Sequence, residues 1–467
     1  MRVWSVAEIE SVLGNRTRGA GKESVGVSTD SRTLAPGNVF VCLSGDSFDG
    51  HAYAAAACEK GATSIIASRS RAAELVESLP KDVNLWLVDD TLQGLSRMAS
   101  HARDTLKCPV LGVAGSNGKT STKDMLAGIA KRVFKNSYAT SGNLNNHIGL
   151  PLTLTNIPVN AQMVILEMGM NHTGELAALS KIARPHHAIV TSVALEHAEF
   201  FSSIEDIARA ELEIVTGMQG GGLLLYHADS PCTEIAVKVA KEHSLRLKLF
   251  KCEDVKVQSS GIEFDFNGKV INNPNYFSRV MAENLLGAIL LLEAAGVPAE
   301  DLARAAAFAR PQARRRFEVF RMQRGNNEIL LIDDSYNANE ASFVAAIRAM
   351  REILPQGRLA LCAGEMAELG AIGPDAHRSV GKAAAQMGFS AVFASGTSDA
   401  QILLDGYRAH SKEGKTILAS EPSKLLEGLN PFEFDGILVK GSRRARMDLV
   451  SDALKLNGFV SQAENDV

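Results

Sequence analysis

The sequence lacks a marked excess of charge of either sign. Its 467 residues include 49 Lys and Arg and 53 Asp and Glu, a formal net charge of -4, and neither half of the chain is acidic or basic. A surface that binds nucleic acid or anionic lipid needs a cluster of basic residues. The composition therefore indicates neither partner, and any anionic ligand must be bound by a local site.

Cysteine is scarce, and long hydrophobic runs are missing. The six cysteines form no CxxC pair and show no metal-ligand spacing, so we expect reduced thiols. The most apolar helical stretch, residues 285–295, is interrupted by Glu293 and is too short to span a bilayer. The first ten residues, MRVWSVAEIE, reach acidic side chains before a signal-peptide core develops. We therefore expect a cytoplasmic protein with no transmembrane segment.

The sequence also lacks repeats, low-complexity tracts and long linkers, so domain boundaries follow from changes in pattern. Its length and its 46% hydrophobic content allow two to four domains. Short β-branched runs alternate with Ala-rich amphipathic stretches up to about residue 105. This pattern predicts a small N-terminal α/β domain at 1–105. Its expected strands are 39–43, 63–67 and 83–88.

Two further α/β domains are predicted beyond residue 105. At 106–311, nearly continuous apolar runs are separated by helical segments, as expected of a parallel sheet covered on both faces. At 312–467 a second alternation, with a helix at 340–353, predicts a Rossmann-like domain. The expected strands are 110–114, 163–167, 188–193 and 222–226 in the central domain, and 329–332, 358–363, 391–394, 416–419 and 436–439 in the last.

The segment VLGVAGSNGKTSTKDML at 110–126 has the layout of a phosphate-binding loop, with an apolar strand, a glycine-containing turn and a helix. Glycines let backbone N–H groups approach phosphates, Lys119 supplies a positive charge, and the Thr120 hydroxyl can bind Mg²⁺. Val113 stands where the strict GxxxxGK[ST] pattern has its first glycine. The strand context favours a nucleotide site over a chance turn, so the central domain is predicted to be of the P-loop mononucleotide-binding type. The predicted nucleotide-binding residues of the loop are Gly115, Ser116, Asn117, Gly118, Lys119, Thr120 and Ser121.

Several motifs, in order along nearly the whole chain, resemble the Mur ligase family and its folylpolyglutamate synthetase relatives. GSNGKTSTK at 115–123 is similar to the family's ATP loop. Four segments resemble signatures of the members that add D-alanyl-D-alanine: SGNLNNHIGLPLTL at 141–154, DDSYNAN at 333–339, EMAELG at 365–370 and KGSR at 440–443. In the first domain, STDSR at 28–32, PG at 36–37 and DGH at 49–51 resemble the part that holds a uridine nucleotide.

The resemblance implies a ligase that uses ATP and Mg²⁺ to join D-alanyl-D-alanine to UDP-N-acetylmuramoyl-tripeptide (UDP-MurNAc-tripeptide). The ATP γ-phosphate would be transferred to a peptide carboxylate, and the amine of the dipeptide would then displace phosphate from the acyl phosphate. Carboxylate and triphosphate are both anions, so metal ions and a lysine must bring them together. The sequence is expected to supply cationic and metal-binding side chains at one site.

Family residues implied to carry this chemistry are Lys119 on the phosphates, Thr120 and Glu167 on a first Mg²⁺, and His197 on a second. Glu167 ends the strand run MVILE, and parallel sheets place ligands at strand ends. Without the resemblance, Glu167 would be a solvated strand-end carboxylate and His197, in LEHAEFF, a packed or surface histidine.

Position 211 departs from the family pattern, which has a carbamylated lysine where IARAELEI at 207–214 has Glu211. A carbamate and a carboxylate carry the same charge and two oxygens, although the glutamate stem is shorter by several bonds. We predict that Glu211 is catalytic with Lys119 and His197, and that it serves the second Mg²⁺ directly or through water without carbon dioxide. The alternative is a site that has lost its second metal and some activity.

The resemblance also implies contacts with the rest of the nucleotide and with both substrates. Asn284 matches an asparagine near adenine, although Val280 and Met281 replace a His-Asn pair, and Arg316 and Asp334 would face the nucleotide. The predicted substrate-binding residues are Ser28, Thr29, Arg32, Asn145, Asn146, Tyr336, Asn337, Asn339, Lys440 and Ser442. The basic run Arg443, Arg444 and Arg446 fits either anion recognition or a solubilising surface.

Two alternative functions remain open. The first is another amide ligase of the same superfamily, which the SYNAN and LNNHIG segments and the lack of a DNPR-like segment disfavour. The second is a non-catalytic ATP-binding scaffold, which the retained Lys119, Thr120, Glu167 and His197 disfavour. A P-loop kinase would leave the first and third domains unexplained. The resemblance implies closure of the third domain on ATP, and a monomer is the expected state.

Overall fold

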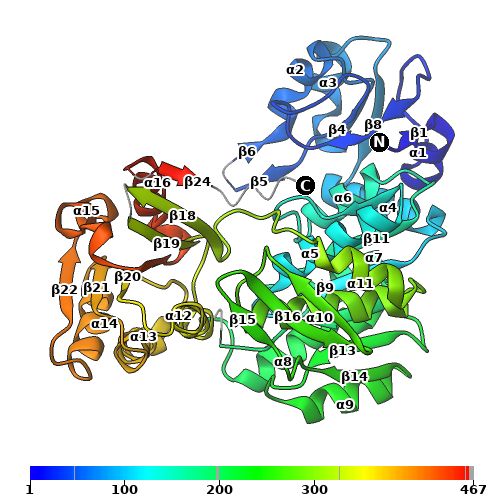
Figure 1. The fold of residues 1–467 in the computed structure, drawn as a ribbon. Helices are drawn as coiled ribbons and strands as arrows, with labels where there is room; N and C mark the ends of the chain where they lie inside the picture. Colours follow the sequence, from blue (N-terminus) through cyan, green and yellow to red (C-terminus); the bar gives the residue numbers. More distant parts are fainter. Residues whose placement is uncertain (47, 196–198, 325–326, 458, 462–467) are drawn as a thin grey trace.

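The computed structural model describes residues 1–46, 48–195, 199–324, 327–457 and 459–461. Figure 1 shows an N-terminal domain in blue, a central domain in cyan and green, and a C-terminal domain in yellow to red that lies beside the other two. Each contains its own large sheet, wholly parallel in the first two domains and mixed in the third, with helices packed on it. Among the helices that the structure describes, none combines the length and apolarity needed to cross a membrane.

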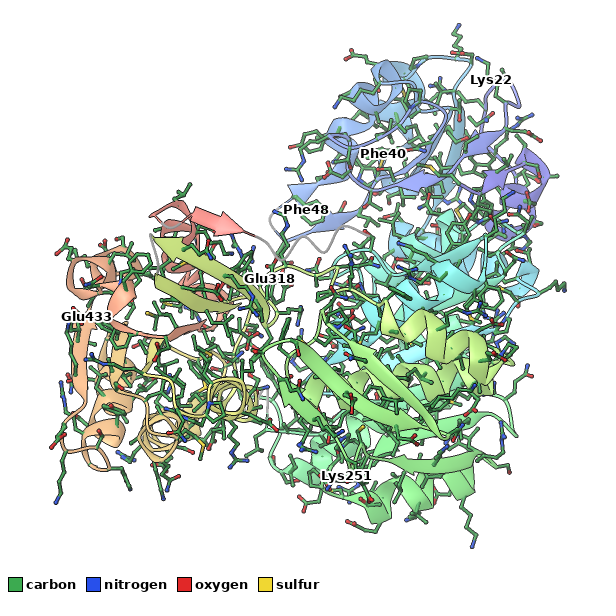
Figure 2. The ribbon with its side chains drawn as sticks, viewed as in Figure 1. Lys22, Phe40, Phe48, Lys251, Glu318 and Glu433 are labelled. Atoms are coloured by element: carbon green, nitrogen blue, oxygen red, sulfur yellow. The ribbon has the colours of Figure 1, made fainter. Side chains whose placement is uncertain are left out.

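The N-terminal domain is built on a four-stranded parallel sheet of order β3-β4-β7-β8. The three predicted strands correspond to β4, β7 and β8, whose apolar side chains are buried. Figure 2 shows Phe40 inside this domain, whereas the half-exposed Phe48 lies on the side facing the C-terminal domain. The elements are β1 (Val3–Trp4), α1 (Val6–Leu13), β2 (Ser24–Val25), β3 (Val27–Ser28), β4 (Val39–Val41), β5 (Ser44–Gly45), β6 (Phe48–Asp49), α2 (Ala54–Glu59), β7 (Ser64–Ser68), α3 (Ala72–Ser78), β8 (Asn84–Val88) and α4 (Thr91–Thr105).

The central domain has a six-stranded parallel sheet of order β10-β11-β9-β12-β13-β14. The chain leaves β9 toward β10 and β11 on one side and later reaches β12 on the other, so the carboxyl end of β9 is a topological switch point. The strands are β9 (Val110–Ala114), β10 (Ser137–Ala139), β11 (Met163–Glu167), β12 (His187–Val190), β13 (Leu223–His227) and β14 (Arg246–Phe250). The helices are α5 (Lys119–Val133), α6 (Gly149–Asn156), α7 (Glu175–Ala183), α8 (Ile204–Leu212), α9 (Thr233–Glu242), α10 (Arg279–Ala294) and α11 (Ala299–Ala307).

A small antiparallel sheet in the central domain was not predicted. It comprises β15 (Lys256–Gln258), β16 (Gly261–Phe266) and β17 (Lys269–Asn273). The turn between β16 and β17 is Asn267-Gly268, and both residues have positive φ, 54° and 78°. Asn-Gly between alternating apolar residues is a strong hairpin signal, so this sheet was predictable from the sequence.

The C-terminal domain contains a seven-stranded sheet of order β22-β21-β20-β23-β19-β18-β24, in which β18 is antiparallel to both of its neighbours. The five predicted strands and the predicted helix at 340–353 are present. The elements are β18 (Glu318–Arg324), β19 (Asn327–Asp334), α12 (Glu340–Ile353), β20 (Leu359–Gly364), α13 (Gly373–Gln386), β21 (Ala391–Ser395), α14 (Ser398–Arg408), β22 (Lys415–Ala419), α15 (Leu425–Gly428), β23 (Gly436–Lys440), α16 (Asp448–Asn457) and β24 (Phe459–Ser461).

Specific hydrogen bonds join the domains. The Asn156 side chain at the end of α6 accepts from the Val27 N–H (3.0 Å) and donates to the Val27 carbonyl (2.9 Å), which fixes the N-terminal domain on the central one. On the other side, the Ala313 N–H donates to Asp124 (2.8 Å), and Arg321 donates to the Ser259 carbonyl (2.9 Å). The C-terminal domain therefore lies directly against the phosphate-loop face of the central domain.

Candidate active site

The predicted phosphate loop connects β9 to α5 at the switch point of the central sheet. Gly115 has φ 125°, and a Cβ there would lie 2.3 Å from the Thr191 hydroxyl oxygen, so only glycine fits. Gly118 has φ 85°, and the Asn284 amide lies against it, with its oxygen 2.9 Å from where a Cβ would be. The two glycines thus let the loop turn tightly between β12 and α10.

A cavity of about 650 Å³ lies over this loop, between the central and C-terminal domains. Many of the predicted residues line it: Ser116, Asn117, Gly118, Lys119, Thr120, Ser121, Asn145, Glu167, Asn284, Arg316, Asp334, Tyr336, Asn337, Asn339 and Lys440. The fold thus gathers side chains from widely separated motifs into one chamber. Gly115 does not line the cavity, and its N–H donates to Glu211.

Lys119 is the first residue of α5, and its ammonium is directed at the loop. It donates to the carbonyl oxygens of Gly115 and Ser116. The neighbouring Thr120 is buried, and its hydroxyl donates to Glu167 Oε1 (3.1 Å). The positive group and the hydroxyl that nucleotide binding requires therefore lie side by side at a helix N-terminus, where the helix dipole also favours anions.

Glu167, the last residue of β11, is 1% exposed. Its Oε1 accepts from Thr120 and from the Asn145 amide (2.8 Å), whereas Oε2 has no hydrogen-bond partner among the residues that the structure describes. A buried carboxylate oxygen without a partner is costly unless a cation binds it. Mg²⁺ commonly takes one or two protein oxygens together with substrate phosphates, so the Thr120 and Glu167 pair fits this ion.

The second predicted metal site is not testable from the geometry. His197 lies outside the described residues. In the part of the chain that the structure describes, no group of three or more His, Cys, Asp or Glu side chains has the arrangement of a metal site.

Glu211 lies on α8 and is 1% exposed. Its Oε2 accepts a hydrogen bond from the Gly115 N–H (2.7 Å). Burial raises the pKa of Glu211, while the charge of Lys119 and the Gly115 hydrogen bond act in the opposite direction. The carboxylate does not line the cavity and contacts the phosphate loop from behind, so its service of a second Mg²⁺, directly or through water, stays a prediction.

The same cavity is lined by two further residues that the sequence did not reveal. His227, the last residue of β13, and Glu283 on α10 lie beside Asn284, and His227 Nε2 is 3.2 Å from a Glu283 carboxylate oxygen. Val280 and Met281 also line the cavity and add apolar surface to it. Strand-end position was the available signal for His227, but only the fold brings it to α10.

The C-terminal wall is formed by the residues after β19 and β23. Lys440 Nζ is buried and lies 2.6 Å from Asp334 and 3.0 Å from the Asn337 carbonyl. Burial raises the pKa of Asp334, which Lys440 and the Phe317 N–H oppose. The guanidinium carbon of Arg316 lies 4.1 Å from the ring centroid of Tyr336. Asp334 and Lys440 thus form an ion pair, while Tyr336, Asn337 and Asn339 line the cavity.

A second, larger cavity of about 980 Å³ adjoins the first, and it is rich in arginine. Arg316, Tyr336, Asn337 and Asn339 line both cavities. Four arginines in its wall have no carboxylate partner among the described residues: Arg314, Arg316, Arg443 and Arg444. Arg446, by contrast, lies 3.4 Å from Asp448 and lines neither cavity. Arg443 and Arg444 therefore lie where an anion could bind, whereas the position of Arg446 fits a solubilising surface.

Some predicted residues lie outside both cavities. Asn146 accepts from the Gly149 N–H (2.9 Å) at the start of α6, which makes it a local capping residue. Ser442 is buried, and its N–H donates to the Glu365 carbonyl (3.1 Å). The substrate contacts of these two residues stay predictions, and neither residue lines a cavity.

The predicted uridine-binding residues lie in the N-terminal domain, outside both cavities. Ser28 ends β3, Thr29 follows it, and the exposed Arg32 lies 2.7 Å from Asp30. The nearby His51 is buried, with Nδ1 2.6 Å from Asp49 and Nε2 accepting from the Ser68 N–H (2.9 Å). His51 therefore supports the local fold, and the exposed group is Arg32.

The fold and site together define a class of enzyme with three α/β domains, in which a P-loop site is covered by a Rossmann-like domain. Sequence models of the Mur ligase family match the chain in all three: the family's catalytic domain at 23–103, its middle domain at 113–292 and its glutamate ligase domain at 315–443. The chain belongs to the Mur ligase family. The predictions of family, α/β fold class and ligase activity are thereby confirmed.

Known relatives resemble the chain over nearly its full length. It is 32% identical to the UDP-N-acetylmuramoyl-tripeptide–D-alanyl-D-alanine ligase of Bacillus subtilis (strain 168), covering 92% of this chain and 93% of the relative. The ligase of the same name from Escherichia coli (strain K12) is also 32% identical, covering 97% and 99%.

Solved structures share the fold. MurF from Acinetobacter baumannii superposes with a TM-score of 0.84 at 24% identity, covering 97% of this chain and 99% of that one. MurF ligase from Thermotoga maritima in complex with ADP gives 0.75 at 24% identity, covering 92% and 96%.

Proposed function

We propose that this chain joins D-alanyl-D-alanine to UDP-MurNAc-tripeptide, forming UDP-MurNAc-pentapeptide, ADP and phosphate for peptidoglycan precursor synthesis. The observation that carries the proposal is the pair of adjoining cavities, one over a phosphate loop and one lined by unpaired arginines. The relatives named above support the choice of substrates, because they carry this activity in their names. The N-terminal domain, with Arg32 exposed, would hold the uridine nucleotide.

ATP would bind over the phosphate loop. Lys119 and the N–H groups at the start of α5 would face the phosphates, and Asn284, His227 and Glu283, which line the same cavity, would lie near the base. Thr120 and Glu167 would hold Mg²⁺, as the unpaired Glu167 oxygen suggests. The ion would neutralise charge on the phosphates and on the reacting carboxylate. These residues explain how two anions can approach each other.

The reaction would proceed in two displacements. The terminal carboxylate of the tripeptide attacks the γ-phosphorus, and the bond from that phosphorus to ADP breaks. The free amine of the dipeptide then attacks the acyl carbon, and phosphate leaves with the carboxylate oxygen as the amine loses a proton. The unpaired arginines of the larger cavity, with Asn337 and Asn339, would orient the carboxylates of the peptide and of the dipeptide. Acyl phosphates hydrolyse readily, and the C-terminal domain would shield this one from water.

The test is phosphate release with ATP, Mg²⁺ and UDP-MurNAc-tripeptide, before and after addition of D-alanyl-D-alanine, with the product mass measured. The expected result is release that depends on the dipeptide and a product of pentapeptide mass. A Lys119→Ala variant is the control for contaminating activity. ATP binding without dipeptide-dependent release would favour the scaffold function, and release with a single amino acid in place of the dipeptide would favour another amide ligase.

We also propose that the protein acts in the cytoplasm as a monomer, where ATP and nucleotide-linked precursors are available. Cell fractionation and sedimentation equilibrium test these two points.

A further inference from the structure

Glu211 is a buried acid that the reaction, as derived above, does not use directly. It lies behind the phosphate loop and is 1% exposed, and neither cavity includes it. Removing a carboxylate from water is costly unless hydrogen bonds and a nearby positive charge compensate. We therefore expect Glu211 to have a function that involves the phosphate loop, which it contacts.

The contacts link Glu211 to both ends of that loop. Its Oε2 accepts from the Gly115 N–H (2.7 Å), and the carbonyl of the same glycine accepts from Lys119 Nζ. The Gly115 N–H is thus hydrogen-bonded to Glu211, and the Gly115 carbonyl is hydrogen-bonded to Lys119. Thr191 lies close to the α-carbon of Gly115 and leaves no space there for a Cβ.

We propose that Glu211 is a positioning residue, an anion behind the phosphate loop that fixes Gly115 and directs Lys119 toward the phosphates of the nucleotide. The inference rests on the proposed function and deepens it. Its physical basis is preorganisation: a lysine held before ATP arrives loses less conformational freedom on binding and needs no rearrangement in the transition state. The negative charge of Glu211 would attract the Lys119 ammonium, and its hydrogen bond to the Gly115 N–H would fix the conformation of the loop.

Two substitutions separate these contributions. Glu211→Gln keeps an oxygen that can accept from Gly115 but removes the charge, whereas Glu211→Ala removes both. We expect kcat for ligation to fall about tenfold in the first and about a hundredfold in the second, with the KM for UDP-MurNAc-tripeptide unchanged. The dissociation constant of a non-hydrolysable ATP analogue should rise about tenfold in Glu211→Gln.

The matched control is Glu213→Gln, two residues further along the chain. Glu213 accepts from the Gly174 and Ala177 N–H groups at the start of α7 and does not contact the loop. The glutamine can keep these hydrogen bonds, so ligation and nucleotide binding should stay near wild-type values. Thermal unfolding of each variant identifies any that fails to fold.

Wild-type kcat and analogue affinity in a folded Glu211→Gln would overturn the inference. So would an equal loss in Glu213→Gln, because the effect would then be one of general charge. Analogue binding requires no peptide substrate. If the wild-type chain binds the analogue but does not ligate, the proposed function fails while the binding measurement still tests Glu211.

Discussion

The two walls of the active site differ in how far their polar groups are already paired. On the central-domain wall, Lys119 and Thr120 have hydrogen-bond partners within the protein, whereas Glu167 Oε2 and His227 Nε2 have none among the described residues. On the C-terminal wall, four arginines line a cavity without a carboxylate partner among the described residues. The first wall is preorganised for one ligand, ATP with its metal. The second depends on the ligand to supply the missing negative charges.

This difference predicts different consequences of substitution. A preorganised group acts mainly in the transition state, so its loss should lower kcat. A partnerless surface arginine acts mainly in binding, so its loss should raise KM. Substitutions on each wall test whether the division is real.

The largest effect is expected from Glu167→Gln. The amide keeps an oxygen for Thr120 and Asn145 but removes the charge at the unpaired position, where Mg²⁺ is proposed to bind. We expect kcat to fall at least about a hundredfold. The melting temperature should stay the same or rise, because the variant no longer buries an incompletely paired charge. Steady-state kinetics and thermal unfolding are the measurements, and a lower melting temperature with retained kcat would show that Glu167 is structural.

A smaller effect, on binding, is expected from Arg444→Ala. This side chain lines the larger cavity without an ion pair, so the KM for UDP-MurNAc-tripeptide or for the dipeptide should rise about tenfold, with kcat nearly unchanged. Arg446→Ala is the control, since Arg446 lies beside Asp448 outside both cavities. Equal KM values in the two variants would mean that the basic run is only a solvated surface.

An effect of a few fold is expected where the two walls touch. Asn339 Nδ2 donates to Asn117 Oδ1 (2.9 Å), while Asn339 also caps α12. Asn339→Ser keeps the cap but is too short to reach the phosphate loop. We expect the KM for ATP to rise about threefold with little change in melting temperature. Asn339→Ala, which removes the cap as well, should additionally lower stability by about 1 kcal/mol. An unchanged KM in the serine variant would show that the contact does not support domain closure.

The sequence predicted those parts of the molecule that depend on local pattern. Apolar runs located most strands of the three large sheets, but β3, β10, β14, β18 and β24 were not predicted. The spacing of Gly115, Gly118 and Lys119 indicated the phosphate loop. The β15 to β17 sheet was not predicted, although Asn267-Gly268 marks the turn between β16 and β17 and the two strands pair in antiparallel register.

Parts of the site that depend on tertiary contacts were harder to predict. Asn146 and Ser442 belong to matching motifs, yet the Asn146 side chain accepts from nearby backbone N–H groups, and Ser442 is buried outside both cavities. His227 and Glu283 meet because β13 ends beside α10, which no spacing in the sequence indicates. For Glu211 the sequence predicted an acid near the site, but only the fold shows that it contacts the Gly115 N–H.

The last prediction is that carbon dioxide has no effect on the ligation rate. The resemblance implies that the family pattern has a carbamylated lysine at position 211, which requires carbon dioxide, whereas Glu211 has a carboxyl group without modification. The wild-type ligation rate should therefore change less than about twofold between degassed buffer and buffer containing bicarbonate at the same pH and ionic strength. A severalfold increase with bicarbonate would mean that another lysine is modified. The central-domain wall would then depend on a charge that comes from modification and not from Glu211. An unchanged rate, together with the loss expected in Glu211→Gln, would show that this chain provides by its own sequence a charge that its relatives obtain by modification.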